Sequence, residues 1–131
     1  MMTLSITGFY ASLLGFLYIG LAINTIRLRK KFKVGINDGG NKDLAKAIRV
    51  HGNFAEYVPI ALILFACYEL NNASVIVLHA LGAMLVAGRA LHVIGLSKTI
   101  GISIQRQVGM LSTFFVILAL AIENIRLFVF G

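Results

Sequence analysis

The sequence has few acidic residues, a single cysteine and a single proline, and these shortages narrow the class of protein. Cys67 stands alone, which excludes a disulfide framework and a cysteine-based metal site, and we expect it to be a buried small apolar residue. The sequence has no three-ligand metal spacing, so we expect no metal. Five Asp and Glu stand against twelve Lys and Arg in 131 residues, which gives a net charge of +7.

Hydrophobic residues, by contrast, are abundant. They make up 59% of the chain, and the mean hydropathy is +0.90. A soluble domain of this composition would lack the polar surface to cover itself, so the chain is predicted to lie in a lipid bilayer. We predict one all-α domain over residues 1–131, an integral membrane four-helix bundle whose spans cover about 4–27, 46–70, 74–96 and 104–128.

The basic residues gather in one part of the sequence, since eight of the twelve lie between Arg27 and Arg49. This distribution indicates a basic connecting loop rather than a basic surface. Positively charged loops face the cytoplasm, so both termini are expected on the opposite side of the membrane. The expected partner of the loop is the anionic headgroups of the lipid bilayer rather than nucleic acid.

Short polar side chains mark where the helices should begin. The second helix is expected to follow Asn41 or Asp43, the third Asn72 or Ser74, and the fourth Ser103, because such residues accept hydrogen bonds from the first helical turn. The short connection between the second and third spans makes these two spans antiparallel neighbours.

The second span carries a narrow polar strip. Arg49, Asn53 and Glu56 are spaced by four and three residues, so they share one face of a helix. Charged and amide groups are costly in contact with acyl chains, so this face should meet protein or a water-filled cavity.

Cationic side chains of the other spans are expected at the same level. Arg27 ends the first span, Arg106 opens the fourth, and Arg89 and His92 share one face near the end of the third. Arginine binds carboxylates through paired hydrogen bonds, whereas a buried carboxylate favours an amine. Converging arginines with Glu56 suggest a ligand with more than one carboxylate and one ammonium group, a pattern of charge that glutathione has.

Two other interpretations of these residues stay open. Glu56 can pair with Arg49 or with an arginine of a neighbouring helix, while the remaining arginines extend toward lipid headgroups. Alternatively, Glu56 can serve as the proton or cation relay of a small channel or transporter subunit.

The segment from Arg49 to Pro59 resembles a motif of the MAPEG family, the membrane-associated proteins in eicosanoid and glutathione metabolism. It reads RVHGNFAEYVP and fits the family pattern R-x-H-x-N-x-x-E-x-x-P of the second span. The run 27–31 (RLRKK) is similar to the family's first cytoplasmic loop, and residues 88–92 (GRALH) are similar to its third span. The pattern is most similar to the short bacterial-type members, which favours a bacterial inner membrane.

The resemblance implies a homotrimer that binds glutathione between neighbouring subunits near the cytoplasmic face. Arg106 would lie near the thiol as the catalytic residue, because an adjacent guanidinium lowers the pKa of a thiol by stabilising the thiolate. The second substrate would be a lipophilic electrophile or peroxide that enters from the bilayer. The residues expected to bind glutathione are Arg27, Arg49, Asn53, Glu56, Tyr57, Arg89, His92 and Gln107.

Two positions depart from the family pattern. Leu96 stands where family enzymes commonly have a tyrosine, and Gln107 follows the arginine of the fourth span where a serine is common. Both departures weaken the case for catalysis more than the case for glutathione binding. The resemblance therefore implies a glutathione transferase or peroxidase, with a non-catalytic lipid- or glutathione-binding scaffold of the same fold as the alternative.

Overall fold

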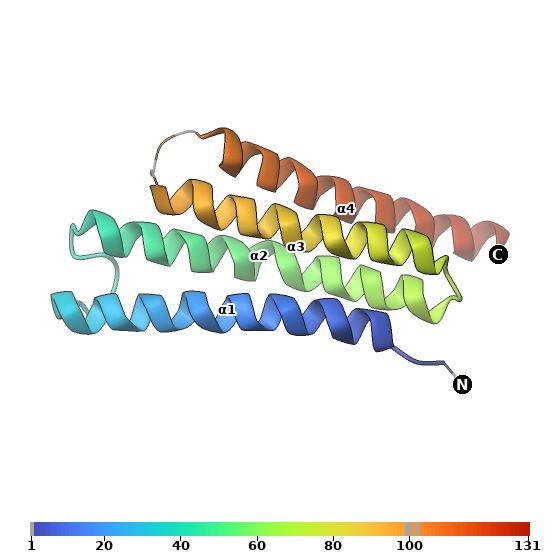
Figure 1. The fold of residues 1–131 in the computed structure, drawn as a ribbon, viewed down its shortest axis with the longest axis horizontal. Coiled ribbons are helices and arrows are strands. Elements are labelled where there is room, and N and C mark those ends of the chain that lie inside the picture. Colours follow the sequence, from blue (N-terminus) through green and yellow to red (C-terminus); the bar gives the residue numbers. More distant parts are fainter. Residues whose placement is uncertain (1, 99–100, 102) are drawn as a thin grey trace.

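Four helices follow one another along the chain and account for nearly all of it (Figure 1). They are α1 (Ser5–Phe32), α2 (Lys42–Leu70), α3 (Val75–Lys98) and α4 (Ile104–Phe130). The computed structural model describes residues 2–98, 101 and 103–131, and no strand occurs in that part of the chain. All four helices are long and apolar enough to cross a membrane. The predicted all-α architecture, with four helices able to span a membrane, is thus confirmed for the described residues.

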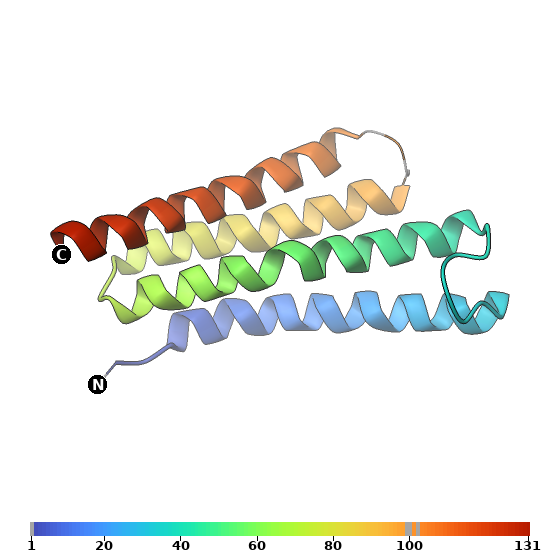
Figure 2. The ribbon, with the colours of Figure 1, turned by 180° about the vertical axis from the view of Figure 1, so that it is seen from behind.

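The helices alternate in direction. Both termini lie at one end of the bundle with the α2–α3 turn, which we call the terminal end (Figures 1 and 2). The α1–α2 and α3–α4 connections lie at the opposite end, which we call the loop end. The middle of the bundle is formed by α2 and α3, which contact each other as predicted and also contact both outer helices, while no contact joins α1 to α4 among the described residues.

Polar side chains begin three of the helices. The side chains of Asn41 and Ser103 accept hydrogen bonds from backbone N–H groups of the first turns of α2 and α4, at 2.9 and 3.2 Å. Ser74 accepts one from the first turn of α3 at 3.4 Å. Of the residues considered above, Asn41 rather than Asp43 and Ser74 rather than Asn72 therefore fill these positions, and Ser103 is confirmed.

The basic segment is mostly helical, so the prediction that it forms a loop is wrong. α1 continues five residues past Arg27 to Phe32, and α2 begins at Lys42, four residues before the predicted start of the second span. Of the eight cations, Lys33 alone lies in the connection between the two helices. Arginine and lysine have high helix propensity, and cations near the carboxyl end of a helix interact favourably with its dipole.

The free backbone N–H groups at the amino end of α1 donate hydrogen bonds to a residue of α2. Leu4 provides no side-chain cap. Instead, the carboxylate of Glu69 accepts hydrogen bonds from the N–H groups of Ile6 and Thr7 at 2.9 and 2.7 Å, and from the Thr7 hydroxyl at 2.6 Å. A carboxylate at this position also complements the positive end of the helix dipole, so Glu69 joins α1 to α2 at the terminal end.

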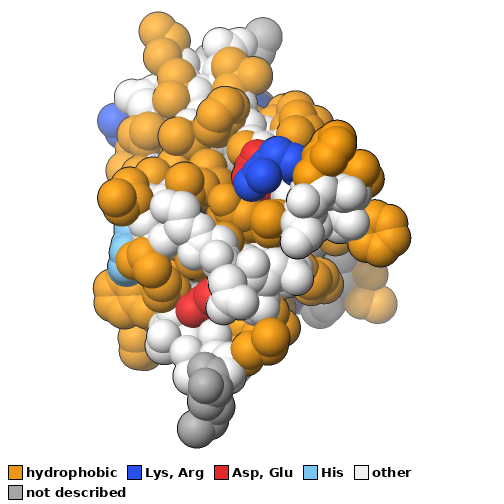
Figure 3. All heavy atoms as spheres, turned by 90° about the vertical axis from the view of Figure 1, so that its right-hand side faces the viewer, with side chains coloured by type: hydrophobic (Ala, Val, Ile, Leu, Met, Phe, Trp, Pro, Cys, Tyr) orange, Lys and Arg blue, Asp and Glu red, His pale blue; other side chains and the backbone are white. Residues whose placement is uncertain are grey.

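Apolar side chains occupy both the interior and the outside of the bundle. Leu14, Phe65, Leu85 and Val116, one from each helix, belong to the buried core. Large apolar side chains also face outward on every helix, and the view from the terminal end is largely hydrophobic (Figure 3). The apolar side chains along the sides of the helices suit acyl chains. Cys67 is exposed, so the expectation that it is buried is wrong.

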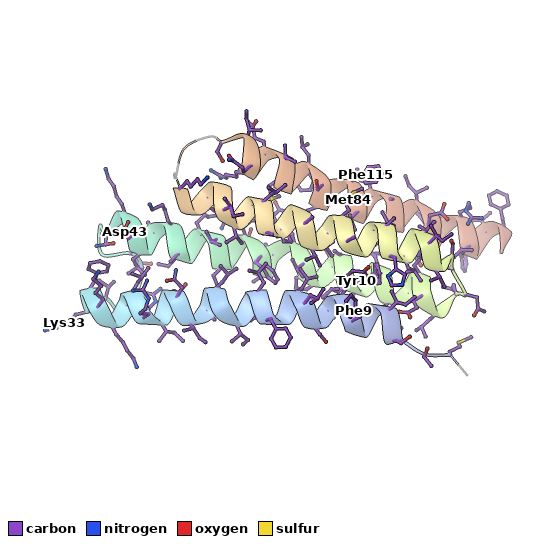
Figure 4. All side chains as sticks on the ribbon, in the orientation of Figure 1. Phe9, Tyr10, Lys33, Asp43, Met84 and Phe115 are labelled. Carbon is purple, nitrogen blue, oxygen red and sulfur yellow. The ribbon has the colours of Figure 1, made fainter. Side chains whose placement is uncertain are left out.

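Glycines allow the helices to approach closely at two levels. Toward the terminal end, Tyr10 of α1 (labelled in Figure 4) lies against Gly82 of α3, because a Cβ atom at Gly82 would come within 2.5 Å of the Tyr10 ring. The Tyr10 hydroxyl is 2.8 Å from Nδ1 of His79. At the loop end, a Cβ atom at Gly109 of α4 would meet the carbonyl oxygen of Gly88 on α3. The contact at Gly109 sets the distance between α3 and α4 beside the candidate site.

We expect Gly109→Ala to lower the free energy of unfolding by about 1–3 kcal/mol, because the added methyl group forces two backbones apart. Gly20→Ala is the matched control, since a Cβ atom at Gly20 meets no atom within 4 Å. Thermal unfolding in detergent compares the two variants. Equal unfolding temperatures would contradict the close approach of α3 and α4.

Candidate functional site

The polar strip of α2, formed by Arg49, Asn53 and Glu56, contains an ion pair. Two guanidinium nitrogens of Arg49 donate to the two carboxylate oxygens of Glu56, at 3.1 and 2.9 Å. The two side chains are two helical turns apart and about half exposed, at 47% and 53%. The structure therefore contains the pairing of Glu56 with Arg49 that the sequence allowed. A paired charge on the outside of a spanning helix is costly next to lipid, so it requires a polar covering.

The third member of the strip, Asn53, points into the bundle. Its side-chain oxygen accepts a hydrogen bond from Arg89 of α3 at 2.7 Å. Arg89 is completely buried, and a second guanidinium nitrogen lies 3.5 Å from the Met110 sulfur. Its remaining nitrogen, Nε, has no partner among the described residues. Arg89 is thus a buried cation held by neutral groups.

His92 lies one helical turn further along α3 and is also completely buried. Neither ring nitrogen has a hydrogen-bond partner in the described part of the chain. Its backbone lies against α4, since a Cβ atom at Gly109 would come within 2.8 Å of the His92 Cβ atom. His92 is therefore buried between α3 and α4, on the helix face that also carries Arg89.

Arg106 stands in the first turn of α4. Its guanidinium donates to the carbonyl oxygen of Gly101 at 3.2 Å. Its backbone lies against α3, since a Cβ atom at Gly95 would come within 2.5 Å of the Arg106 nitrogen. Arg106, Gln107 and Met110 line an open pocket of about 260 Å³, and Gln107 is exposed. The two predicted residues of α4 are therefore accessible from outside the bundle.

Two of the predicted site residues have other surroundings. Arg27 donates to Asn24 at 2.9 Å and lines a separate groove between α1 and α2, so one subunit does not bring it to the polar strip. Tyr57 follows Glu56 on α2, and its ring packs edge-on against Phe114 of α4 with ring centroids 5.6 Å apart. Leu96, at the position where a tyrosine is common, is 2% exposed.

Sequence reasoning missed two neighbours of Arg89. Met110 provides a sulfur acceptor, and the Phe54 ring centroid is 5.6 Å from the guanidinium carbon of Arg89. The sequence contained a sign of Met110, because this residue follows Arg106 by four positions and shares its helix face. No spacing rule joins Phe54 to Arg89, since the two residues come from different helices.

We expect Asn53→Leu to lower the free energy of unfolding by about 2–3 kcal/mol, because Arg89 loses its oxygen acceptor while it stays buried. The double variant Asn53→Leu/Arg89→Met should lose less free energy of unfolding than the two single variants lose together, since it removes both polar groups. Chemical unfolding in detergent measures all three. Additive losses would show that the two side chains do not depend on each other.

Comparisons with known proteins cover nearly the whole chain. The family model described as "MAPEG family" matches residues 7–126. The inner membrane protein YecN of Escherichia coli (strain K12) is 34% identical over 120 residues, which are 92% of this chain and 90% of that protein. YecN of Escherichia coli O6:H1 matches with the same identity and coverage. The range that the family model matches contains all four helices almost entirely, and the chain is therefore a member of the MAPEG family.

Proposed function

We propose that this protein binds glutathione and transfers it to lipophilic electrophiles, or uses it to reduce lipophilic peroxides, as a homotrimer in a bacterial inner membrane. The observation that carries the proposal is the half-exposed ion pair of Arg49 and Glu56 on a spanning helix. It offers a cation and an anion at one place, as a ligand with carboxylate and ammonium groups requires. Family membership and the inner membrane location named for YecN support the rest.

The ion pair also supports the assembly. Contact of the charged strip with acyl chains would cost free energy, so we propose that a neighbouring subunit covers it. Arg27 lies apart from the strip within one subunit. We therefore assign Arg27 to the glutathione site of the adjacent subunit, which makes each site depend on two copies of the chain.

Each residue has a separate role in binding. Arg49 and Arg27 would hold the glutathione carboxylates through paired hydrogen bonds, and Glu56 would bind the ammonium group. Arg89 and His92 are completely buried, so we assign them an indirect role: Arg89 orients Asn53 and holds positive potential behind the site, and His92 packs on the same helix face. Tyr57 and Gln107 flank the site from α2 and α4.

Arg106 has the chemical role in this proposal. Its guanidinium would stabilise the glutathione thiolate, which is the nucleophile. In transfer, the sulfur forms a bond to the electrophilic carbon while the leaving group departs with its electron pair. In peroxide reduction, the sulfur attacks one peroxide oxygen and releases an alcohol. The sulfur keeps the hydroxyl group as a sulfenic acid. The thiol of a second glutathione then attacks this sulfur, the hydroxyl group leaves as water and the disulfide forms, so two thiols are oxidised for each peroxide reduced.

The orientation follows from charge. The basic residues of α1 and α2 gather at the loop end, and the positive-inside rule places that end in the cytoplasm with both termini outside it. The glutathione site, which lies toward the same end, would then draw on cytoplasmic glutathione.

A scaffold that binds glutathione or lipid without catalysis is the second candidate. The side chain of Leu96 is buried where family enzymes commonly have a tyrosine, so this position supplies no hydroxyl to the thiol. Gln107 likewise stands in place of a serine. The two candidates share every binding residue and differ only in turnover.

The test uses the purified full chain in detergent, titrated with glutathione by calorimetry and then assayed for conjugation of chlorodinitrobenzene. Binding with conjugation supports the transferase, and binding without turnover of electrophiles or peroxides supports the scaffold. Proton flux through liposomes that depends on Glu56, with no glutathione binding, would overturn both and favour the relay.

A further inference from the structure

A polar groove between α1 and α2 at the loop end lies apart from the strip of α2. Its volume is about 260 Å³, and its polar lining comes from Asn24, Arg27 and Lys31 of α1 and from Asp43 and Lys46 of α2. Asp43 marks this end of the bundle in Figure 4. None of the three strip residues lines the groove, and Arg27 is the only residue common to it and to the glutathione site proposed above.

The groove carries a positive charge. Three cations against one carboxylate leave a formal charge of +2 among its lining residues. The carboxylate of Asp43 is 3.6 Å from the Lys46 ammonium, and its side chain is 68% exposed, so it offsets little of that charge. The guanidinium of Arg27 is held toward Asn24 at 2.9 Å, which fixes one donor in place. The ligand that suits this groove is therefore an anion.

The groove also lies at the boundary between apolar and charged surface. Ile19, Ile23 and Ile26 of α1 are exposed on one side of this level, and Arg27 and Lys30 are exposed immediately after them. In a membrane, this change marks the passage from acyl chains to headgroups. An anion bound here would have acyl chains next to it.

We propose that this groove binds the phosphate of an anionic phospholipid between Lys31 and Lys46, while Arg27 adds to the positive charge of the groove. Basic pockets between spanning helices at headgroup level bind such lipids, and each basic residue near the surface adds to the attraction. Leu21, Leu28, Ala47 and Val50 complete the lining of the groove, and this apolar part favours a lipid phosphate over a free phosphate ion. Because Lys31 and Lys46 have no role in the glutathione site, the two proposals can be tested separately.

The experiment compares two double variants of the purified full chain that remove the same charge. Lys31→Gln/Lys46→Gln changes the groove, while Lys30→Gln/Lys42→Gln changes two exposed lysines of the same helices that do not line it. Native mass spectrometry in detergent measures binding of phosphatidylglycerol, of phosphatidylcholine and of inorganic phosphate. Glutathione binding is measured on the same samples.

The groove variant should lose about tenfold in phosphatidylglycerol affinity and the control variant much less, with phosphatidylcholine bound weakly by all. In both double variants, glutathione binding should equal that of the unaltered protein, whether or not the proposed function holds. An equal loss in the two variants would show a diffuse attraction and overturn the groove as a site. Inorganic phosphate binding that depends on the groove lysines, with no preference for phosphatidylglycerol, would overturn the lipid as its ligand.

Discussion

Arg49→Ala and Glu56→Gln should each lower the affinity for glutathione about 100-fold, because each leaves one charged group of the ligand without its partner in a covered site. Arg49→Ala removes the donor for a glutathione carboxylate, and Glu56→Gln removes the acceptor for the ammonium group. Isothermal titration of the purified protein with glutathione measures both. For a glutathione analogue that lacks the corresponding carboxylate or ammonium group, the loss of affinity should be smaller. Such an analogue does not make the interaction that the substitution removes.

The terminal end provides a matched control for this experiment. Arg126 and Glu123 of α4 also form an arginine–glutamate ion pair, in which Nε and one terminal guanidinium nitrogen donate to the carboxylate at 2.8–3.2 Å, with side chains 51% and 29% exposed. Arg126→Ala and Glu123→Gln therefore remove a comparable pair at the opposite end of the bundle. Glutathione affinity should stay within experimental error of the unaltered protein. A similar loss in both sets would indicate that the variants disturb folding rather than a site.

The second large effect concerns Arg106. Arg106→Ala should lower kcat for conjugation at least about 100-fold with little change in KM for glutathione, because the guanidinium acts on the thiolate rather than on the peptide. The ultraviolet absorbance of bound thiolate should fall in parallel. The measurement is steady-state conjugation together with a difference spectrum on glutathione addition.

Arg106→Lys separates charge from geometry in the same assay. A lysine keeps the positive charge near the sulfur but loses the planar donor pair, so intermediate kcat and partial thiolate absorbance are expected. An unchanged kcat in Arg106→Ala would remove the catalytic role of this residue. An unaltered protein that binds glutathione without turnover would favour the scaffold instead.

Much of the fold could be predicted from sequence because the bilayer imposes strong rules. Helix number follows from apolar stretches long enough to cross, and Asn41 and Ser103 begin helices because short polar side chains accept from free N–H groups. The prediction was wrong for the basic segment, because a high density of charge does not by itself indicate a loop. Charge places a segment relative to the membrane, whereas helix propensity decides whether it is helical.

The site was only partly predictable, for a related reason. Helical spacing placed Arg49, Asn53 and Glu56 on one strip, but it could not show that Asn53 turns inward to Arg89 while the other two pair outside. Contacts between helices depend on side-chain directions and on the separation set by residues such as Gly109. For the same reason, the sequence could not reveal that α1 is capped by Glu69.

A structure of the assembly in lipid nanodiscs with glutathione present is the most direct measurement. We expect one glutathione between each pair of subunits, with a carboxylate on the guanidinium of Arg49 and the ammonium group on Glu56. If these two side chains instead face lipid acyl chains in the assembled protein, and glutathione is bound elsewhere or not at all, the proposed site does not exist.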